Sequence, residues 1–202
     1  MKVVILAGGY GTRIADVSSD LIPKPMIPIG NKPIIWHIMN IFARFGYNDF
    51  VIALGYKSKI IREYFNNNII ENKESKWKIK LINTGLDSLT GTRLYKLRKH
   101  LSNERFFLTY GDGLSNININ KLLNFHIKNK KKITMSAVRP PARFGEIYFK
   151  KNNVISFEEK PQIQNGWING GFFVVEPGFL KFLNSKKNEM LERDPLKKAI
   201  KG

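Results

Sequence analysis

The sequence predicts an α/β domain built on a largely parallel sheet, because short apolar runs alternate along it with longer segments of helical periodicity. Its 202 residues suit one domain and are enough to bury a sizeable core. No internal repeat, low-complexity stretch or linker rich in Pro and Gly interrupts the chain. We therefore expect residues 1–202 to form a single domain.

The first strand and the first helix are expected at the N-terminus. Residues 2–7 are apolar after Lys2, as in a strand that is buried on both faces of a parallel sheet. Residues 33–45 carry apolar side chains at helical spacing behind Pro33, a residue that suits the first turn of a helix.

The same alternation continues to residue 138. Residues 50–54 predict a buried strand, and residues 58–65 predict a helix. Apolar and basic side chains alternate over residues 77–82, as they do in a half-exposed strand. A helix, a buried strand, a helix and a strand then follow, at residues 93–101, 105–109, 119–127 and 133–138.

The pattern changes after Pro140 and Pro141. Short strands are expected near residues 147–149, 154–157 and 171–175, so the second half of the sheet is expected to be mixed. Asp194 and Pro195 predict the N-cap and the first position of a helix over residues 196–201.

The composition excludes several classes of protein. Cysteine is absent, which excludes disulfide scaffolds, thiolate catalysis and cysteine metal sites. The apolar run at residues 3–7 is too short for the core of a signal peptide or for a membrane span. We therefore expect a cytoplasmic protein with no membrane partner.

The formal net charge of +18 raises the question of nucleic-acid binding. Lys outnumbers Arg, however, and Lys, Asn and Ile share A/T-rich codons, so genome composition is a competing cause. The densest cluster is expected to be a solvated helix end, and it comprises Lys128, Lys130, Lys131 and Lys132. No nucleic-acid motif is present, so we expect the charge to attract small polyanions and keep nucleic-acid binding as a weaker alternative.

A glycine-rich turn directly follows the first predicted strand. The segment reads Leu6, Ala7, Gly8, Gly9, Tyr10, Gly11, Thr12 and Arg13. Glycines here allow a tight turn whose N–H groups approach an anion closely. Ile14 stands where a dinucleotide fingerprint needs its third Gly, and no Gly-Lys-Ser/Thr of a P-loop follows. Arg13 and Lys24, the latter held between two prolines, add two cations suited to a polyphosphate.

A second signal is Asp112, which lies between Gly111 and Gly113 at the carboxyl end of a predicted strand. Open α/β sheets bind ligands outside these strand ends. A carboxylate there suits Mg²⁺, although a hydrogen bond within a local turn is the alternative. The three histidines offer no such signal: His37 is expected to pack or cap, and neither His100 nor His126 has a partner at metal-ligand spacing.

Taken together, these motifs resemble the sugar-phosphate nucleotidyltransferase family. The motifs that match in order are residues 8–13, 23–26, 111–113, 159–161 and 169–172. Residues 36–39 and 84–93 resemble the glucose-1-phosphate cytidylyltransferase branch. The resemblance implies a Rossmann-like, doubly wound mixed sheet, the nucleotide-diphospho-sugar transferase fold. It also implies transfer of a nucleotidyl group from an NTP to a sugar 1-phosphate, with release of pyrophosphate. The cytidylyltransferase branch implies CTP and glucose 1-phosphate as the substrates, and CDP-glucose as a product used for surface polysaccharide.

The resemblance assigns roles to individual residues. Arg13 would hold the β- and γ-phosphates, Lys24 would neutralise charge at the α-phosphate, and Asp112 would hold Mg²⁺. The residues expected to contact the nucleotide are Leu6, Ala7, Gly8, Gly9, Tyr10, Gly11, Thr12, Arg13, Lys24, Ser88, Arg93 and Gly111. The residues expected at the sugar phosphate are Glu159, Lys160, Asn169 and Gly170.

The chain departs from the family pattern in two places. The polar stretch at residues 66–76 is shorter than the insertion usual in the branch, which leaves the base, the sugar and any homo-oligomer open. The sequence also ends at Gly202, whereas the family continues into a segment with a second metal-binding Asp. A C-terminal truncation is therefore expected, and the alternative function is binding of NTP or sugar phosphate without turnover.

Overall fold

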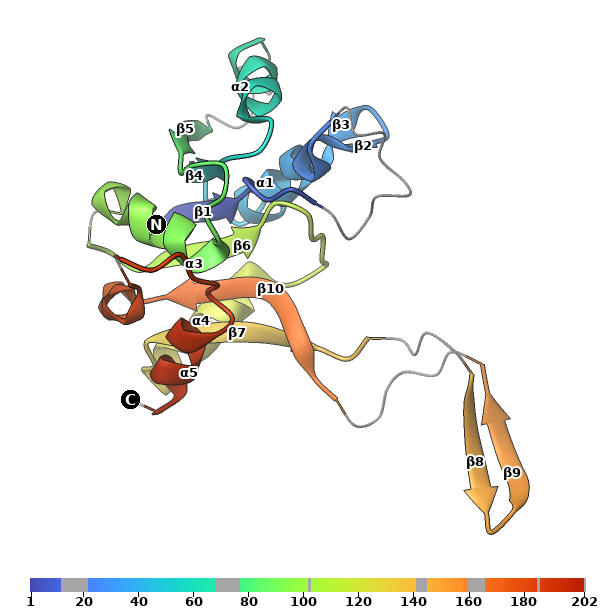
Figure 1. Cartoon of the computed structure of the whole chain (residues 1–202). Helices are drawn as coiled ribbons and strands as arrows, with labels where there is room; N and C mark the ends of the chain where they lie inside the picture. Colours follow the sequence, from blue (N-terminus) through green and yellow to red (C-terminus); the bar gives the residue numbers. More distant parts are fainter. Residues whose placement is uncertain are drawn as a thin grey trace. The chain divides into compact units, whose positions relative to one another are not determined.

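The computed structural model describes residues 1–11, 22–67, 77–101, 103–140, 145–159, 166–184 and 186–201 (Figure 1). The chain divides into two compact units: Met1–Thr134 with Phe172–Gly202, and Met135–Gly171. The single domain expected over residues 1–202 stays a prediction.

A six-stranded sheet in the order β5-β4-β1-β6-β10-β7 organises the fold. Four of its strands are parallel: β1 (Lys2–Leu6), β4 (Asp49–Leu54), β5 (Lys78–Asn83) and β6 (Phe106–Tyr110). β10 (Ile168–Val175) pairs antiparallel with β6, and β7 (Ile133–Val138) is next to β10. The expected mixed sheet with a parallel first half is confirmed.

The chain winds from β1 to β4 and β5, then returns to the other side of β1 to form β6. The order of the strands reverses between the neighbours β1 and β6, which makes their carboxyl ends a topological switch point. Open α/β sheets bind ligands outside the strand ends at such a point. In the register of the sheet, Leu6 lies opposite Ala53 of β4 and Tyr110 of β6. The residues that follow these three positions therefore meet at one edge of the sheet.

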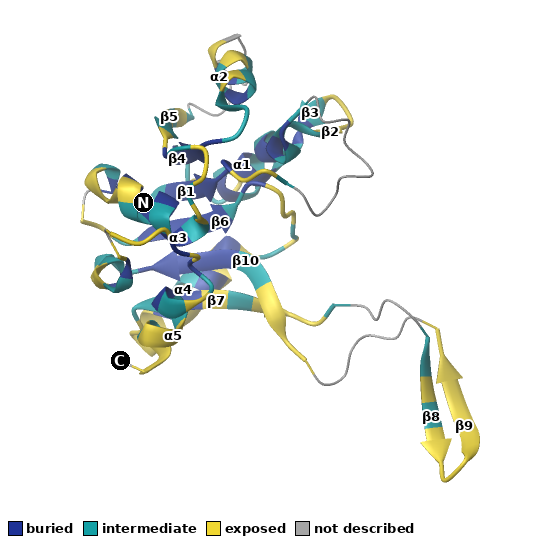
Figure 2. Ribbon diagram, in the orientation of Figure 1, coloured by how far each residue is buried: buried dark blue, intermediate teal, exposed yellow. Residues whose placement is uncertain are grey.

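Helices cover both faces of the sheet, because successive side chains of a buried strand point to opposite faces. Val3 and Ile5 pack with α1 (Ile34–Ala43), α2 (Ser58–Asn67) and α4 (Ile119–Asn129). Val4 and Leu6 lie in a second core, with α3 (Thr90–Leu97) and the 3-10 helix η4 (Pro177–Phe182). The buried strands between these layers are dark blue in Figure 2.

Helix α3 begins and ends earlier than the sequence predicts. The helix expected at residues 93–101 starts at Thr90 and ends at Leu97, and a 3-10 turn, η3 (Arg98–His100), follows it. Its first N–H groups, at Gly91 and Thr92, donate to the carbonyl of Glu189 at 3.0 and 3.2 Å. A partner about a hundred residues away thus satisfies the start of the helix, and no local pattern reveals it.

Several short elements have no counterpart in the sequence prediction. They are the 3-10 turn η2 (Lys24–Met26) and the two-residue strands β2 (Pro28–Ile29) and β3 (Lys32–Pro33). The last helix, α5 (Asp194–Lys201), begins two residues before the expected start at residue 196. Asp194, expected to be its N-cap, is instead its first residue, and its carboxylate accepts a hydrogen bond from Lys187 Nζ at 3.2 Å.

The second unit contains an antiparallel hairpin of β8 (Glu146–Lys150) and β9 (Asn153–Glu158). Both strands were expected from the sequence, but they form a two-stranded sheet of their own and are not part of the six-stranded sheet. Within the same unit, the Arg139 guanidinium lies 4.5 Å from the centre of the Trp167 ring. Of the described helices, none combines the length and apolarity needed to cross a bilayer.

We expect Phe107→Ala to lower the free energy of unfolding by about 3–5 kcal/mol, as other truncations of large buried residues do. Phe107 is fully buried on β6, and its ring packs against Phe42 and Tyr47. Phe125→Ala is the matched control, because that ring is 60% exposed on α4. Urea unfolding measures both, and an equal loss in the two variants would contradict this description of the core.

Candidate functional site

The glycine-rich turn and the end of β6 are in direct contact at the switch point. Gly111 N donates to Leu6 O at 2.9 Å. A Cβ placed on Gly111 would lie 3.1 Å from Ala7 Cα, so this close approach favours glycine. The contact sets Asp112, the next residue, beside the turn that follows β1.

Lys24 and Asp112, two of the three expected catalytic residues, form an ion pair of 2.8 Å between Nζ and Oδ2. Gly11, with a φ of +75°, approaches the Lys24 side chain so closely that an added Cβ would lie 3.4 Å from Lys24 Cβ. The glycine-rich turn, Lys24 and Asp112 are therefore neighbours, as a shared polyphosphate ligand requires. The third expected catalytic residue, Arg13, lies outside the described residues, as does Thr12.

Arg93 is at the centre of a hydrogen-bond network that includes the glycine-rich turn. Its Nη1 donates to Leu54 O, Thr84 Oγ1 and Gly85 O at 3.1, 2.7 and 2.8 Å. Its Nη2 donates to Gly8 O and Leu86 O at 2.7 and 3.0 Å. Arg93 is only 3% exposed, and burial lowers its pKa, although a guanidinium remains charged in proteins. The family resemblance implies that Arg93 contacts the nucleotide. In the structure, both of its terminal nitrogens donate hydrogen bonds to protein oxygens, and Arg93 thereby holds three loops together.

Ser88, another expected nucleotide contact, belongs to the loop at residues 84–89. Its hydroxyl donates to Thr84 O and accepts a hydrogen bond from Lys96 Nζ at 2.9 Å. Lys96 Nζ also donates to Thr84 O at 2.7 Å. Sequence reasoning missed Lys96, because its position in α3 resembles that of an ordinary exposed helix residue.

Tyr10 joins the glycine-rich turn to the same loop. Its hydroxyl donates to Asp87 Oδ1 at 2.7 Å, and that hydrogen bond raises the pKa of Tyr10. The Tyr10 and Tyr56 rings lie 5.1 Å apart, centre to centre. Aromatic faces at this position could stack on a nucleobase. Neither Asp87 nor Tyr56 was singled out from the sequence, since they come from different loops.

A C-terminal segment, residues 187–192, forms hydrogen bonds with the loop at residues 84–89. Asn188 accepts from Leu89 N and donates to Asp87 O, both at 2.8 Å. Glu192 accepts from Thr90 Oγ1 at 2.7 Å and from the hydroxyl of Tyr110, which ends β6 just before Gly111. The segment thus links the loop at residues 84–89 to β6, the strand that ends two residues before Asp112.

The residues expected at the sugar phosphate belong to the second unit. Asn169 Oδ1 accepts a hydrogen bond from Gly171 N at 2.8 Å, and a Cβ on Gly170 would lie 2.7 Å from Ser136 Oγ. Glu159 lies near Gly145, whose added Cβ would be 3.1 Å from Glu159 Oε2. Lys160 lies outside the described residues.

Asp112 is the residue that could hold a divalent cation. Within the described parts of the chain, no group of three or more His, Asp or Glu side chains could hold a metal ion. A single carboxylate is nevertheless compatible with Mg²⁺, which is often bound by one or two carboxylates together with substrate phosphates. In the structure, the Lys24 ammonium neutralises this carboxylate.

Comparison with known proteins identifies the family. The nucleotidyl transferase family model matches residues 2–201. The chain belongs to this family.

Within the nucleotidyl transferase family, the chain is 39% identical over 217 residues to a probable glucose-1-phosphate cytidylyltransferase of Bacillus subtilis, covering 100% of this chain and 85% of that protein. It is also 39% identical over 214 residues to the glucose-1-phosphate cytidylyltransferase of Salmonella typhimurium, covering 97% and 82%. These matches confirm the predicted branch. HddC from Yersinia pseudotuberculosis, complexed with GMP-PN, has a TM-score of 0.75 and 26% identity, covering 98% of this chain and 85% of HddC.

We expect Gly8→Ala to lower the free energy of unfolding by about 3 kcal/mol, because the site cannot accommodate a side chain. The added Cβ would lie 2.3 Å from Arg93 Nη1 and 2.8 Å from Gly55 N, and five hydrogen bonds prevent Arg93 from moving aside. Gly9→Ala is the control, since nothing lies within 4 Å of its added Cβ. Urea unfolding measures both variants, and a stable Gly8→Ala protein would refute the tight packing.

We expect Arg93→Lys to lower the free energy of unfolding by about 3 kcal/mol. The Arg93 guanidinium donates to five acceptors, and a single lysine ammonium would leave some of these buried acceptors without a hydrogen bond. Arg98→Lys is the control: Arg98 is exposed and stacks on Tyr95 with 3.7 Å between guanidinium carbon and ring centre. Thermal unfolding compares the two. If both variants unfold alike, Arg93 does not hold the loops.

Proposed function

We propose that the chain transfers the cytidylyl group of CTP to glucose 1-phosphate, giving CDP-glucose and pyrophosphate. The observation that carries the proposal is the 2.8 Å pair of Lys24 and Asp112 next to the glycine-rich turn at the switch point. The choice of CTP and glucose 1-phosphate rests on the two relatives that bear this name at 39% identity. Such an activity implies a cytoplasmic location, where nucleoside triphosphates are made.

The proposed reaction is a displacement at the α-phosphorus. A phosphate oxygen of glucose 1-phosphate attacks the α-phosphorus of CTP in line, and the bond from that phosphorus to the bridging oxygen of the β-phosphate breaks. Because the chemistry needs little covalent help, this chain's residues would mainly position the reactants and neutralise charge. The N–H groups of the turn from Leu6 to Thr12 would hold the triphosphate, with Arg13 on its β- and γ-phosphates.

Lys24 is the residue proposed to neutralise charge at the α-phosphate during the displacement. Its ammonium is held by Asp112 in the structure. An incoming phosphate attracts the ammonium, while Asp112 is left to a cation that arrives with the nucleotide. When bound at Asp112, Mg²⁺ would offset the negative charge of the pyrophosphate leaving group.

The remaining proposed contacts select the substrates. Ser88 and Gly111 would lie against the nucleotide, and Arg93 would position it through Gly8 and the loop at residues 84–89. In the second unit, Glu159 would accept hydrogen bonds from sugar hydroxyls, and Lys160 would pair with the sugar phosphate. Asn169 and Gly170 would line the sugar pocket.

Purified protein incubated with CTP, Mg²⁺ and glucose 1-phosphate tests the proposal through pyrophosphate release and detection of CDP-glucose. UTP, dTTP, GTP and ATP in place of CTP, and mannose 1-phosphate in place of glucose 1-phosphate, measure specificity. We expect CTP and glucose 1-phosphate to give the highest kcat/KM. Binding of Mg-CTP in calorimetry without pyrophosphate from any pair would overturn the proposed transfer in favour of binding alone.

We expect Lys24→Ala to lower kcat about 10²–10³-fold, comparable to removing one oxyanion donor elsewhere. The control is Lys59→Ala on α2, since the Lys59 side chain is 88% exposed and pairs with Glu63, four residues later in the helix. Both variants should unfold at nearly the same temperature as the parent. Full activity in Lys24→Ala would remove Lys24 from the mechanism.

A further inference from the structure

A cavity of about 240 Å³ opens at the opposite edge of the sheet from the switch point. Its lining residues are Arg105, His126, Ile127, Lys130, Lys131, Lys132 and Glu176. Arg105 immediately precedes β6, whereas Gly111 and Asp112 immediately follow it. The five residues of β6 span roughly 17 Å at the usual strand rise, so the cavity is separate from the nucleotide site.

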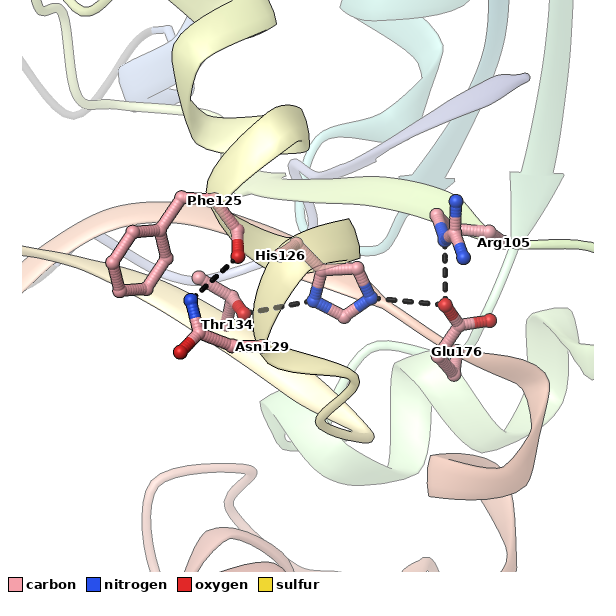
Figure 3. A network of polar contacts seen from close by, with 6 residues as sticks. All are labelled: Arg105, Phe125, His126, Asn129, Thr134 and Glu176. Carbon is pink, nitrogen blue, oxygen red and sulfur yellow. Dashed lines mark hydrogen bonds and ion pairs between the residues drawn. The ribbon is translucent and has the colours of Figure 1, made fainter.

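His126 is buried and lines this cavity. Figure 3 shows its polar contacts. Its Nδ1 lies 2.8 Å from Thr134 Oγ1, and its Nε2 lies 3.0 Å from Glu176 Oε1. No carboxylate partner of His126 is evident from local spacing in the sequence; the structure supplies Glu176, fifty residues later, from the end of β10. Both ring nitrogens are thereby engaged, which fixes the ring.

Glu176 is shared with Arg105, whose Nε donates to the same Oε1 atom at 2.5 Å (Figure 3). Burial raises the pKa of the Glu176 carboxyl, but the hydrogen bonds from His126 and Arg105 outweigh burial and leave that pKa below its ordinary value. Glu176 is therefore ionised and satisfied from two sides. Arg105 makes no hydrogen bond through Nη1 or Nη2 to any other described residue, so both remain available to a ligand.

Three consecutive lysines complete the lining. Helix α4 ends at Lys130, whose left-handed conformation (φ +50°) and N–H bond to His126 O turn the chain toward β7. The solvated helix end expected from the sequence is confirmed, because Lys130 and Lys131 are exposed and Lys132 is partly buried. The same three lysines also line the cavity. The Lys132 ammonium also lies 5.1 Å from the centre of the Phe182 ring. With Arg105, the lining has four cationic side chains against one carboxylate.

We propose that this cavity is a second anion site, which binds the phosphate or pyrophosphate group of a small phosphorylated molecule. An Arg with two available nitrogens provides a planar fork for two oxygens of a phosphate, and the adjacent ammonium groups add charge. The His126–Glu176 pair keeps the fork in place before a ligand arrives, which reduces the entropy lost on binding. The proposal does not depend on the catalytic activity proposed above.

Histidine NMR tests the site without relying on activity. The chain has three histidines, so labelling with ¹³Cε1-histidine gives three signals, assigned through His37→Gln and His100→Gln. Inorganic phosphate, pyrophosphate and glucose 1-phosphate are titrated separately at constant ionic strength. We expect a saturable shift of the His126 signal and none at His100. Tighter binding of pyrophosphate would identify free pyrophosphate as the source of the anion, and tighter binding of glucose 1-phosphate would identify a sugar phosphate.

The double variant Lys130→Ala/Lys131→Ala should weaken this binding at least roughly tenfold, since two cations next to the anion are removed. Lys128→Ala is the matched control, because Lys128 lies on the same helix but not in the lining. Both should keep the parent unfolding temperature. The proposal is overturned by a His126 shift that is equal in both variants, by one that sodium chloride reproduces, or by no saturable shift with any of the three anions. A shift caused only by a single-stranded oligonucleotide would also overturn it, in favour of a nucleic-acid surface.

Discussion

The buried guanidinium of Arg93 is the interaction on which the proposed site depends. It binds the carbonyl groups of Gly8, Leu54, Gly85 and Leu86 together with the hydroxyl of Thr84. Placing a charge in a nearly water-free position costs several kcal/mol, and only a full set of hydrogen bonds offsets that cost. The loops must therefore stay close to the guanidinium, because moving any one of them leaves a buried donor and acceptor unpaired.

This constraint explains the glycines around Arg93 better than a general need for flexibility does. Gly8 and Gly55 leave the space that the guanidinium fills, since an added Cβ on either would lie within 2.4 Å of Arg93 Nη1. The hydrogen bond from Arg93 Nη2 to Gly8 O restrains the start of the glycine-rich turn. The segment at residues 187–192 adds a second restraint, because it bonds both the loop at residues 84–89 and Tyr110. Both restraints pre-organise a ligand site before a ligand binds.

Most of the fold could be predicted from local pattern, and most of the polar framework could not. The buried strands expected at residues 50–54 and 105–109 have the apolar runs that identify them. Lys24 and Asp112 were expected at one polyphosphate from the family resemblance and not from local pattern, and the structure shows them as an ion pair. Glu189, Asn188 and Glu176 gave no signal, because their partners lie 50–101 positions away in the sequence. The predicted role of Arg93, a nucleotide contact, missed its hydrogen bonds to Gly8 and Leu54 for the same reason.

Cationic side chains are paired differently at the two edges of the sheet. At the switch point, Lys24 and Asp112 neutralise each other until a ligand and its cation separate the two. At the opposite edge, four cationic side chains share the one carboxylate of Glu176, which leaves an excess of positive charge. An unbalanced cluster attracts anions at all times, whereas a paired one responds only to a ligand that can replace both partners. The same basic composition can thus provide selectivity at one edge and general attraction for phosphates at the other.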